Sequence, residues 1–442
     1  MRIFRNAVEG REELLVRRPL ETEELPMDMR ETTFKAFGQE LAPDEVVRRI
    51  IRDVREDGDN AVTYYNTRFD GAQGTPDLRV SDDDIRAAYD SVDGEVVDAL
   101  KFAADRIRRY HEQQMRGAFF DFNQNGLGQM TRAIEKVGIY VPGTRAPLPS
   151  TVLMCAIPAK VAGCDEVYMT SAVLPDGSVP PVKLVAADVA GVDGVFRGGG
   201  AQGIAAFAYG TETFPKVDKI CGPGGLFVTI AKKQVYGDVG IDSIYGPTET
   251  VVIADESADP EMVAADLLAQ AEHDALASPI LLTPSHYLAD EVAKCIDRQL
   301  KEMERAKIAS AALENRGGCI LVNDIDHAIE LANEYAPEHL CLMVENPVAY
   351  APKVRNAGGL FLGESSPEAI GDYTAGPSHT MPTGGSARWS SPLSVNDFIK
   401  TTSIVNIPEE LTEELARAAS VLARAEGLTG HAHAVERRIQ GR

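Results

Sequence analysis

The sequence lacks any long hydrophobic run. No stretch approaches the roughly 18 consecutive apolar residues that a membrane-spanning helix requires. The first residues, Met1 to Glu9, also lack the apolar segment of a secretory signal peptide. These absences argue against a membrane partner, and we expect a soluble protein of the cytoplasm.

Positive charge is in short supply. The chain carries 44 Lys and Arg against 67 Asp and Glu, which gives a net charge of −23, and it contains no basic cluster with interleaved aromatic residues. Such a surface repels the phosphate backbone of DNA or RNA. Nucleic acid is therefore excluded as a partner, and the acidic surface reflects either a need for solubility or a salty environment.

Cysteine is scarce and unpatterned. Six thiols occur, and no two have the CxxC spacing of a redox or zinc-binding motif. They lie in apolar segments, which is typical of buried, reduced side chains and argues against both disulfides and a cysteine-zinc centre. The six are Cys155, Cys164, Cys221, Cys295, Cys319 and Cys341.

What remains is an ordinary globular composition, 44% hydrophobic and 25% charged, in a chain of 442 residues that is long enough for two or three domains. Between about residues 43 and 115, apolar residues recur at helical spacing. From Val137 onward, short β-rich runs alternate with helical segments, and a second such block begins near Thr250. This alternation is typical of α/β folds with parallel sheets.

We therefore predict an α/β protein with two Rossmann-like parallel-sheet lobes, a helical N-terminal region and a small helical C-terminal tail. The expected divisions are an N-terminal arm over 1–36, a first lobe over 37–139 plus 250–390, a second, nucleotide-side lobe over 140–249, and a tail over 391–442. The tail is rich in Ala, Glu and Arg and is too small to bury a core. It should therefore dock on another lobe or swap onto another subunit.

The most informative motif is Gln270-Ala-Glu-His273. The preceding Asp259-Pro260-Glu261 has the residues of a helix start, so the motif falls on a helix. Residues three apart share a helix face, and Gln270 and His273 can therefore point at one ion or one substrate. Taken alone, such a pair is more often an ordinary polar helix face that carries a histidine.

Two glycine-rich turns follow predicted strands. Gly198 to Gly203 comes after Val195-Phe196 and before a helix, and Cys221 to Gly225 comes after Ile220 in the same setting. A turn of this kind can cradle phosphate with backbone N–H groups and a helix N-terminus. Together the two turns favour a nucleotide-sized cleft, although glycine turns also serve simple packing.

Several polar loops carry carboxylates and imidazoles. Glu338-His339 follows a predicted helix and precedes an apolar strand, and adjacent side chains that leave a loop in different directions can serve two separate proton transfers. Asp372, His379 and the segment from Glu426 to His431 lie in similar settings. Taken one at a time, each of these could be a solvated surface loop.

Seven motifs occur in one order along the chain. They are Val141-Pro-Gly with Ala146-Pro-Leu-Pro-Ser-Thr-Val-Leu-Met154, Gly199-Gly-Ala-Gln202, Gly246-Pro-Thr-Glu249, Gln270-Ala-Glu-His273, Pro337-Glu-His-Leu340, Gly371-Asp-Tyr373 and Glu426-Gly-Leu-Thr-Gly-His431. In this combination the chain resembles the histidinol dehydrogenase family, collinearly from about residue 35 to 440. The resemblance implies a zinc-dependent homodimer that oxidises L-histidinol in two NAD-dependent steps, through the aldehyde, to L-histidine, the last stage of histidine biosynthesis.

The resemblance also assigns roles to residues. It implies four zinc ligands, which are Gln270, His273, Asp372 and His431. In the family the last of these comes from the partner subunit, and zinc chiefly holds the imidazole and amine of the substrate. The implied catalytic pair is His339, which removes the hydroxyl proton as hydride leaves for NAD, and Glu338, which activates water to hydrate the aldehyde.

Further contacts follow from the same resemblance. The implied substrate-binding set is Thr248, Gln270, His273, His339, Asp372, His379, Glu426 and His431. Tyr140, Gln202 and Gly225 occupy cofactor-binding positions. Thr248 stands where the family usually has serine and keeps the hydroxyl. Gly225 replaces an asparagine, and Gly143-Thr144-Arg145 replaces the more usual double glycine, so the affinity for the cofactor can differ from that of the family.

Three alternatives stay open. Related dehydrogenases of the same family oxidise small sulfonated diols, although Pro337, Glu426 and His379 favour histidinol. A metal-dependent hydrolase would use the same four ligands to activate water, and the glycine turns argue against it. A non-catalytic protein stabilised by zinc would need neither the Glu338 carboxylate nor a nucleotide.

Overall fold

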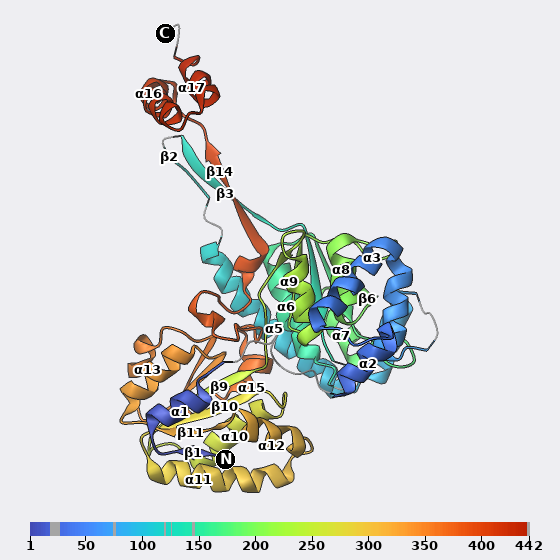
Figure 1. Cartoon of the computed structure of the whole chain (residues 1–442), viewed down its shortest axis with the longest axis vertical. Coiled ribbons are helices and arrows are strands. Elements are labelled where there is room, and N and C mark those ends of the chain that lie inside the picture. The colour runs from blue at the N-terminus through green and yellow to red at the C-terminus, as the bar shows by residue number, and fades with distance from the viewer. Residues whose placement is uncertain (18–26, 74–76, 119–120, 125, 144–145, 440–442) are drawn as a thin grey trace.

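The structure, a computed structural model, describes residues 1–17, 27–73, 77–118, 121–124, 126–143 and 146–439. It consists of two α/β bodies and a narrow C-terminal arm that projects away from both (Figure 1). Each body contains a sheet whose strands are all parallel, which confirms the predicted α/β class. Across the described part of the chain, no helix combines the length and the apolar character needed to cross a bilayer.

The five-stranded sheet has the strand order β6-β5-β4-β7-β8. Its strands are β4 (Lys136–Val141), β5 (Glu166–Ser171), β6 (Gly194–Arg197), β7 (Lys219–Cys221) and β8 (Gly240–Ile241). The connecting helices are α6 (Pro149–Ala162), α7 (Pro181–Ala190), α8 (Gly200–Tyr209) and α9 (Leu226–Val235). In the central strand β4, Ile139 lies opposite Met169 on one side and Cys221 on the other, and all three side chains are buried. A sheet that is covered on both faces has such continuous apolar strands.

The helical N-terminal region covers both faces of this sheet. It contains α2 (Met27–Phe37), α3 (Pro43–Tyr65), the π-helical turn η2 (Asn66–Asp70), α4 (Asp82–Ser91) and α5 (Gly94–Ala118). Ile50 of α3 shares one core with Phe207 of α8, and Ile107 of α5 belongs to the core on the other face. The expected grouping of 37–139 with 250–390 therefore does not hold for these helices. Helical periodicity marks the apolar face of a helix but not the sheet that it covers.

The six-stranded sheet has the strand order β1-β11-β10-β9-β12-β13. Its strands are β1 (Ile3–Phe4), β9 (Glu249–Ala254), β10 (Ser278–Thr283), β11 (Gly318–Leu321), β12 (His339–Met343) and β13 (Gly359–Leu362). One face packs against α10 (Pro260–Ala271), α11 (His286–Gln299) and α12 (Ala306–Asn315), and the other against α1 (Ala7–Leu14) and α13 (Ile325–Tyr335). Every residue of β9, β10 and β12 is buried, so these strands form the centre of the lobe.

The first residues of the chain belong to this lobe. Ile3 and Phe4 pair with β11, and Leu14 of α1 lies in the core of the sheet. The structure thus differs from the separate arm expected over 1–36, because a strand of two residues is too short to show a pattern in the sequence. Short helical turns complete the lobe and its connection to the C-terminus. They are η3 (Leu300–Glu302), α14 (Pro347–Tyr350), η4 (Ala351–Lys353), α15 (Glu368–Ile370), η5 (Gly371–Ala375), η6 (Ser386–Arg388) and η7 (Val395–Phe398).

The projecting arm is a three-stranded antiparallel sheet with two helices at its tip (Figure 1). Its strands are β2 (Phe122–Gln124), β3 (Leu127–Ala133) and β14 (Ile399–Val405), and its helices are α16 (Glu409–Ala425) and α17 (Thr429–Glu436). Phe398 still lies in the core of the five-stranded lobe, so the arm leaves the body later than the boundary expected at residue 391. On α16, Leu415, Val421 and Leu422 are 49%, 69% and 65% exposed. The apolar face of this helix is therefore largely uncovered.

Candidate active site

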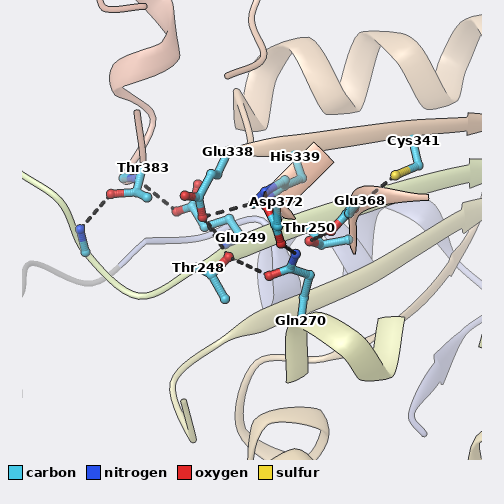
Figure 2. Close-up of polar contacts among 12 residues, drawn as sticks. Thr248, Glu249, Thr250, Gln270, Glu338, His339, Cys341, Glu368, Asp372 and Thr383 are labelled. Atoms are coloured by element: carbon cyan, nitrogen blue, oxygen red, sulfur yellow. Dashed lines mark hydrogen bonds and ion pairs between the residues drawn. The ribbon is translucent and has the colours of Figure 1, made fainter. Parts of the chain in front are cut away.

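Five of the predicted site residues gather near the amino ends of strands in the six-stranded sheet, as Figure 2 shows. Thr248 immediately precedes β9, and Glu338 and His339 lie where β12 begins. Gln270 lies in the last turn of α10, which returns the chain to this edge, and Asp372 lies in η5. Segments far apart in the sequence thus bring their polar side chains to one place.

Gln270 contacts Asp372, and the charge of Asp372 also acts on His273. The helix start at Asp259 is confirmed, because its side chain caps the first turn of α10. The helix ends before His273, which lies in the following turn. The side-chain amide of Gln270 donates from Nε2 to Oδ2 of Asp372 at 3.3 Å. His273 is exposed at the end of the turn, and the protein around it partly desolvates the ring and lowers its pKa, while the charge of Asp372 opposes this change.

The carboxylate of Glu338 is held by two donors. Oε2 lies 2.7 Å from the hydroxyl oxygen of Thr248 and accepts from the backbone N–H of Glu249 at 3.3 Å. The same hydroxyl lies 3.1 Å from Oε1 of Gln270, and its single proton can serve only one acceptor at a time. Burial raises the pKa of Glu338 to about 7, against the effects of His339 and Thr248. A carboxylate with this pKa is suited to accept a proton near neutral pH.

His339 is buried among carboxylates. Its Nδ1 lies 3.6 Å from Oε2 of Glu338, and its Nε2 lies 3.6 Å from Oδ1 of Asp372. Within the described chain, neither ring nitrogen has a hydrogen-bond partner. Burial lowers the pKa of His339, but the charges of Glu368, Glu338 and Asp372 outweigh it and raise this pKa above its ordinary value. The carboxylates therefore favour the protonated ring, and a cation beside them would favour the neutral ring that can accept a proton.

Glu368 is a site residue that the sequence did not reveal. It is fully buried behind His339, and its carboxylate accepts from the hydroxyl of Thr250 and the thiol of Cys341, both at 2.9 Å. Burial raises its pKa. Glu368 follows Pro367 at a helix start, where an acidic residue is ordinary, so no local signal separated it from a capping residue.

His379 connects the site to the five-stranded lobe. Its Nδ1 lies 2.8 Å from the backbone oxygen of Asp372, and since a carbonyl can only accept, Nδ1 carries the proton. Its Nε2 is then the acceptor for the hydroxyl of Thr151, 3.1 Å away in the first turn of α6. Both ring nitrogens are occupied by the protein. The predicted contact of His379 with substrate stays a prediction.

The structure does not bring Glu426 and His431 to this site within one chain. Both are exposed on the C-terminal arm, Glu426 directly after α16 and His431 in α17, and the tip of the arm projects away from the six-stranded sheet (Figure 1). Accordingly, no group of three or more His, Cys, Asp and Glu side chains that could hold a metal occurs among the described residues. One chain supplies the pair of His273 and Asp372, with Gln270 beside them.

The predicted cofactor residues lie at the carboxyl ends of the five-stranded sheet. Tyr140 is near the end of β4, and its hydroxyl accepts from the backbone N–H of Gly200 at 3.1 Å. Gln202 is buried in α8 and donates to Asn66 at 3.2 Å, while its Oε1 has no partner in the described part of the chain. Gly225 caps the start of α9, with open space where a Cβ would lie. Thr144 and Arg145 lie outside the described residues.

The glycine turns occur where the sequence predicts them, between β6 and α8 and between β7 and α9. The first turn is also tightly packed. A Cβ on Gly203 would lie 2.2 Å from the backbone oxygen of Gly198, and Gly200 has a φ of +54°. The turn therefore needs glycine for its own geometry, and it presents the N-terminus of α8 at the sheet edge.

Comparisons with known proteins agree with the geometry. The family model described as histidinol dehydrogenase matches residues 38–439. The histidinol dehydrogenase of Synechococcus sp. is 49% identical over 397 residues, which cover 89% of this chain and 92% of that protein. That of Methanocaldococcus jannaschii is 48% identical over 410 residues, with coverage of 92% and 94%.

A solved structure shows the same architecture. The crystal structure of histidinol dehydrogenase from Elizabethkingia anophelis has a TM-score of 0.89 and 36% sequence identity, and the match covers 100% of this chain and 98% of that one. Sequence and fold thus agree over nearly the whole length. The chain belongs to the histidinol dehydrogenase family.

Proposed function

We propose that this protein is a histidinol dehydrogenase, which oxidises L-histidinol through the aldehyde to L-histidine with NAD as hydride acceptor. The observation that carries the proposal is the convergence of Glu338, His339, Gln270 and Asp372 at one sheet edge, in a chain that belongs to this family (Figure 2). The relatives compared above all bear the name histidinol dehydrogenase, and none favours a sulfonated diol as substrate.

The reaction needs two hydride transfers and one hydration. In the first step R–CH2OH and NAD+ give R–CHO, NADH and H+. In the second, R–CHO, water and NAD+ give R–COO−, NADH and two H+. His339 is placed to accept the hydroxyl proton in its neutral form, which a bound cation would favour by offsetting the carboxylates that raise its pKa. The adjacent Glu338 is placed to accept the proton of the attacking water. Glu338 thus serves the hydration, whereas His339 accepts a hydroxyl proton in both oxidations, first from the alcohol and then from the hydrated aldehyde.

The donor set fits a zinc ion. Gln270, His273 and Asp372 offer an amide oxygen, an imidazole nitrogen and a carboxylate, which are ligands that zinc accepts. The amide oxygen of Gln270 would have to turn from Thr248 toward the ion. Zinc bound there would supply a cationic anchor for the imidazole and amine of the substrate. The resemblance implies four protein ligands, and this site supplies three, so one coordination position of the zinc would be filled by a residue from elsewhere.

That position points to a homodimer with a shared active site. His431 and Glu426 are exposed on an arm that cannot reach the site of its own chain, and the apolar face of α16 beside them is uncovered. A second copy of the chain would cover this face and receive both side chains in its site. The same symmetry would return the partner subunit's tail to the first site.

NAD is proposed to bind at the carboxyl ends of the five-stranded sheet. The glycine turns before α8 and α9 present helix N-termini there, and Tyr140, Gln202 and Gly225 lie beside them. Helix N-termini favour the negative charge of a pyrophosphate. The missing asparagine at Gly225 predicts a weaker contact with the cofactor than in relatives that have it.

A stoichiometric assay tests the proposal. Purified protein is incubated with limiting L-histidinol and excess NAD, and NADH is counted by absorbance. The expected yield follows from the two equations above, two NADH for each histidinol, and it should vanish after treatment with a chelator. One NADH, or faster turnover of alcohols without an imidazole, would contradict the histidinol assignment. Absence of NAD binding in a titration would favour the hydrolase alternative.

A further inference from the structure

Arg17, near the N-terminus, reaches the back of the catalytic turn. Its guanidinium donates from Nε to Oε1 of Glu249 and from Nη2 to Oε2, both at 2.8 Å. Nη2 also donates to the backbone oxygen of Ala336 at 3.2 Å, and the guanidinium lies 3.9 Å from the centre of the Tyr335 ring. The side chains of the ion pair are 25% and 7% exposed, so water competes little for this bidentate contact.

The two partners of Arg17, Glu249 and Ala336, both help to position Glu338. Ala336, two residues before it, has a φ of +53°, a left-handed conformation that a residue with a Cβ keeps only when its surroundings hold it. Glu249 donates its backbone N–H to the Glu338 carboxylate, beside the hydroxyl of Thr248. Arg17 thus braces the turn from which Glu338 projects and the strand end that holds its carboxylate.

The carboxylate of Glu249 is fully engaged. Besides the two bonds from Arg17, its Oε1 accepts from the backbone N–H of Gly384 at 3.2 Å. This bond joins the turn at Thr383 and Gly384 to the ion pair of Arg17 and Glu249. Figure 2 shows Glu249 between this turn and Glu338. Arg17 lies outside residues 38–439, the part of the chain that the family model matches, so that match assigns it no role.

We propose that Arg17 is a positioning residue for the second oxidation. It fixes the backbone at Ala336 and the strand end at Glu249, and thereby places the Glu338 carboxylate without touching substrate. The inference rests on the proposed function, in which Glu338 activates water for the aldehyde step. Lysine cannot replace Arg17 fully, because a single ammonium lacks the planar fork that binds both carboxylate oxygens and the Ala336 carbonyl together.

The test compares Arg17→Gln, Arg17→Lys and a control, Arg11→Gln, in the full-length protein. Arg11 lies in the same N-terminal segment and pairs with Glu334 at the surface, where the two side chains are 53% and 49% exposed. The rate of the first hydride transfer from L-histidinol is measured by rapid mixing, because steady-state turnover from this substrate includes both oxidations. The parameters kcat and KM are measured with L-histidinaldehyde as starting substrate. Thermal melting of each variant reports on folding.

Arg17→Gln should lower kcat for the aldehyde by about 10- to 100-fold, since small displacements of a catalytic group cost this much. The rate of the first hydride transfer from the alcohol and the KM for the aldehyde should change by less than about threefold, because His339 and the binding groups keep their places. Arg17→Lys should lie between Arg17→Gln and wild type. Arg11→Gln should match wild type in both steps.

Three results would overturn the inference. They are an unchanged aldehyde step in Arg17→Gln, equal losses in both steps, and a selective loss of the same size in Arg11→Gln. If Arg17→Gln does not fold, Arg17→Lys decides by the same criteria. A wild-type protein that oxidises neither substrate would remove the proposed function and this inference with it, whereas an active wild type with equal losses in Arg17→Gln removes the inference alone.

Discussion

The two lobes share one architecture but present functional groups at opposite edges of their sheets. In the five-stranded sheet, glycine turns and helix N-termini lie at the carboxyl ends of β6 and β7. In the six-stranded sheet, Thr248, Glu338 and His339 lie at the amino ends of β9 and β12. Ligands of open parallel sheets generally bind at the carboxyl ends. The five-stranded lobe offers a site of this usual kind, and the six-stranded lobe departs from it.

The opposite edge of the six-stranded sheet shows why a nucleotide is not expected there. A hollow at the carboxyl ends of β9, β10 and β12 is lined by Asp255, Glu256, Ser257, Pro284, Ser285 and Glu345. Its carboxylates repel phosphate, whereas the glycine turns of the other lobe attract it. A parallel sheet therefore supplies two edges, and the side chains at each edge decide its use.

The largest effect is expected from substitutions at the amino end of β12, where Glu338 and His339 lie. His339→Asn should lower kcat by about 10²- to 10⁴-fold in both oxidations, because it removes a proton acceptor that both steps use. Glu338→Gln should cause a loss of similar size mainly in the aldehyde step. Rapid-mixing assays that start from either substrate measure the two steps separately. Equal losses with both variants would contradict this division of roles.

A smaller effect is expected at the carboxyl edge of the five-stranded sheet. Gly203→Ala would place a Cβ 2.2 Å from a backbone oxygen and force the turn to shift. If the overpacking cost of about 1–3 kcal/mol falls on the turn that binds NADH, the Kd for NADH should rise by about 5- to 150-fold. Fluorescence titration measures this Kd. Gly225→Ala meets open space and is the control; if it weakens binding as much as Gly203→Ala does, the turn is not the cause.

The lobes also differ in their buried charges. The six-stranded lobe buries the carboxylates of Asp266 and Glu368, whereas the five-stranded lobe buries the ammonium group of Lys183 and the ion pair of Lys232 with Asp242. Burial, with a contribution from the charge of Glu368, raises the pKa of Asp266 to about 7. Within the described residues, its Oδ2 has no hydrogen-bond partner. An ionised Asp266 is therefore unfavourable in the folded state.

This difference predicts a pH dependence of stability. Between about pH 4 and pH 7 the unfolded chain has released the proton of Asp266 while the folded chain still holds it, so the free energy of unfolding falls as pH rises. Asp266→Asn should remove this loss and stabilise the protein at pH 8 by about 1–3 kcal/mol. Urea unfolding at both ends of the range measures the difference. If Asp266→Asn changes the free energy of unfolding by the same amount at pH 4 and at pH 8, the ionisation of a buried Asp266 is not the cause.

The smallest effect is expected at the acidic edge. Glu256→Gln combined with Glu345→Gln removes two exposed charges and leaves the backbone contacts of Asp255 in place. The KM for NAD and kcat should stay within about twofold of wild type, because long-range surface charge is screened at ordinary salt. A steady-state assay suffices. A marked fall in the KM for NAD would contradict this contrast between the two sheets, since it would place the nucleotide near the acidic edge.

Local patterns were sufficient for features that depend on near neighbours. The helix start at Asp259, the glycine turns and the α/β alternation all follow from capping, backbone freedom and periodicity, which act over a few residues. The assignment of α3 and α5 to a lobe could not be predicted in this way. It depends on which sheet the helices meet, and their apolar faces would suit either sheet.

Long-range contacts account for the rest of the site. Arg17 and Glu249 are 232 positions apart, and nothing near either residue indicates the other. Glu368 was hidden because an acid at a helix start is common. The positions of Glu426 and His431 on a projecting arm could not be seen in the sequence either, since an amphipathic helix does not show whether its partner is the same chain or another copy.

Strand β1 has a consequence for the order in which the protein matures. Ile3 and Phe4 leave the ribosome long before Cys319 and Ile320, the residues with which they pair. At a synthesis rate of about 5–20 residues per second, this partner strand emerges on the order of 15 to 60 seconds later. All strands of the five-stranded sheet, the last of which ends at Ile241, have been made by then, whereas β1 has had no partner strand until that point. The amino terminus, with Arg17, is thus among the earliest segments made and among the last to dock, and it stays accessible to chaperones and proteases during that interval.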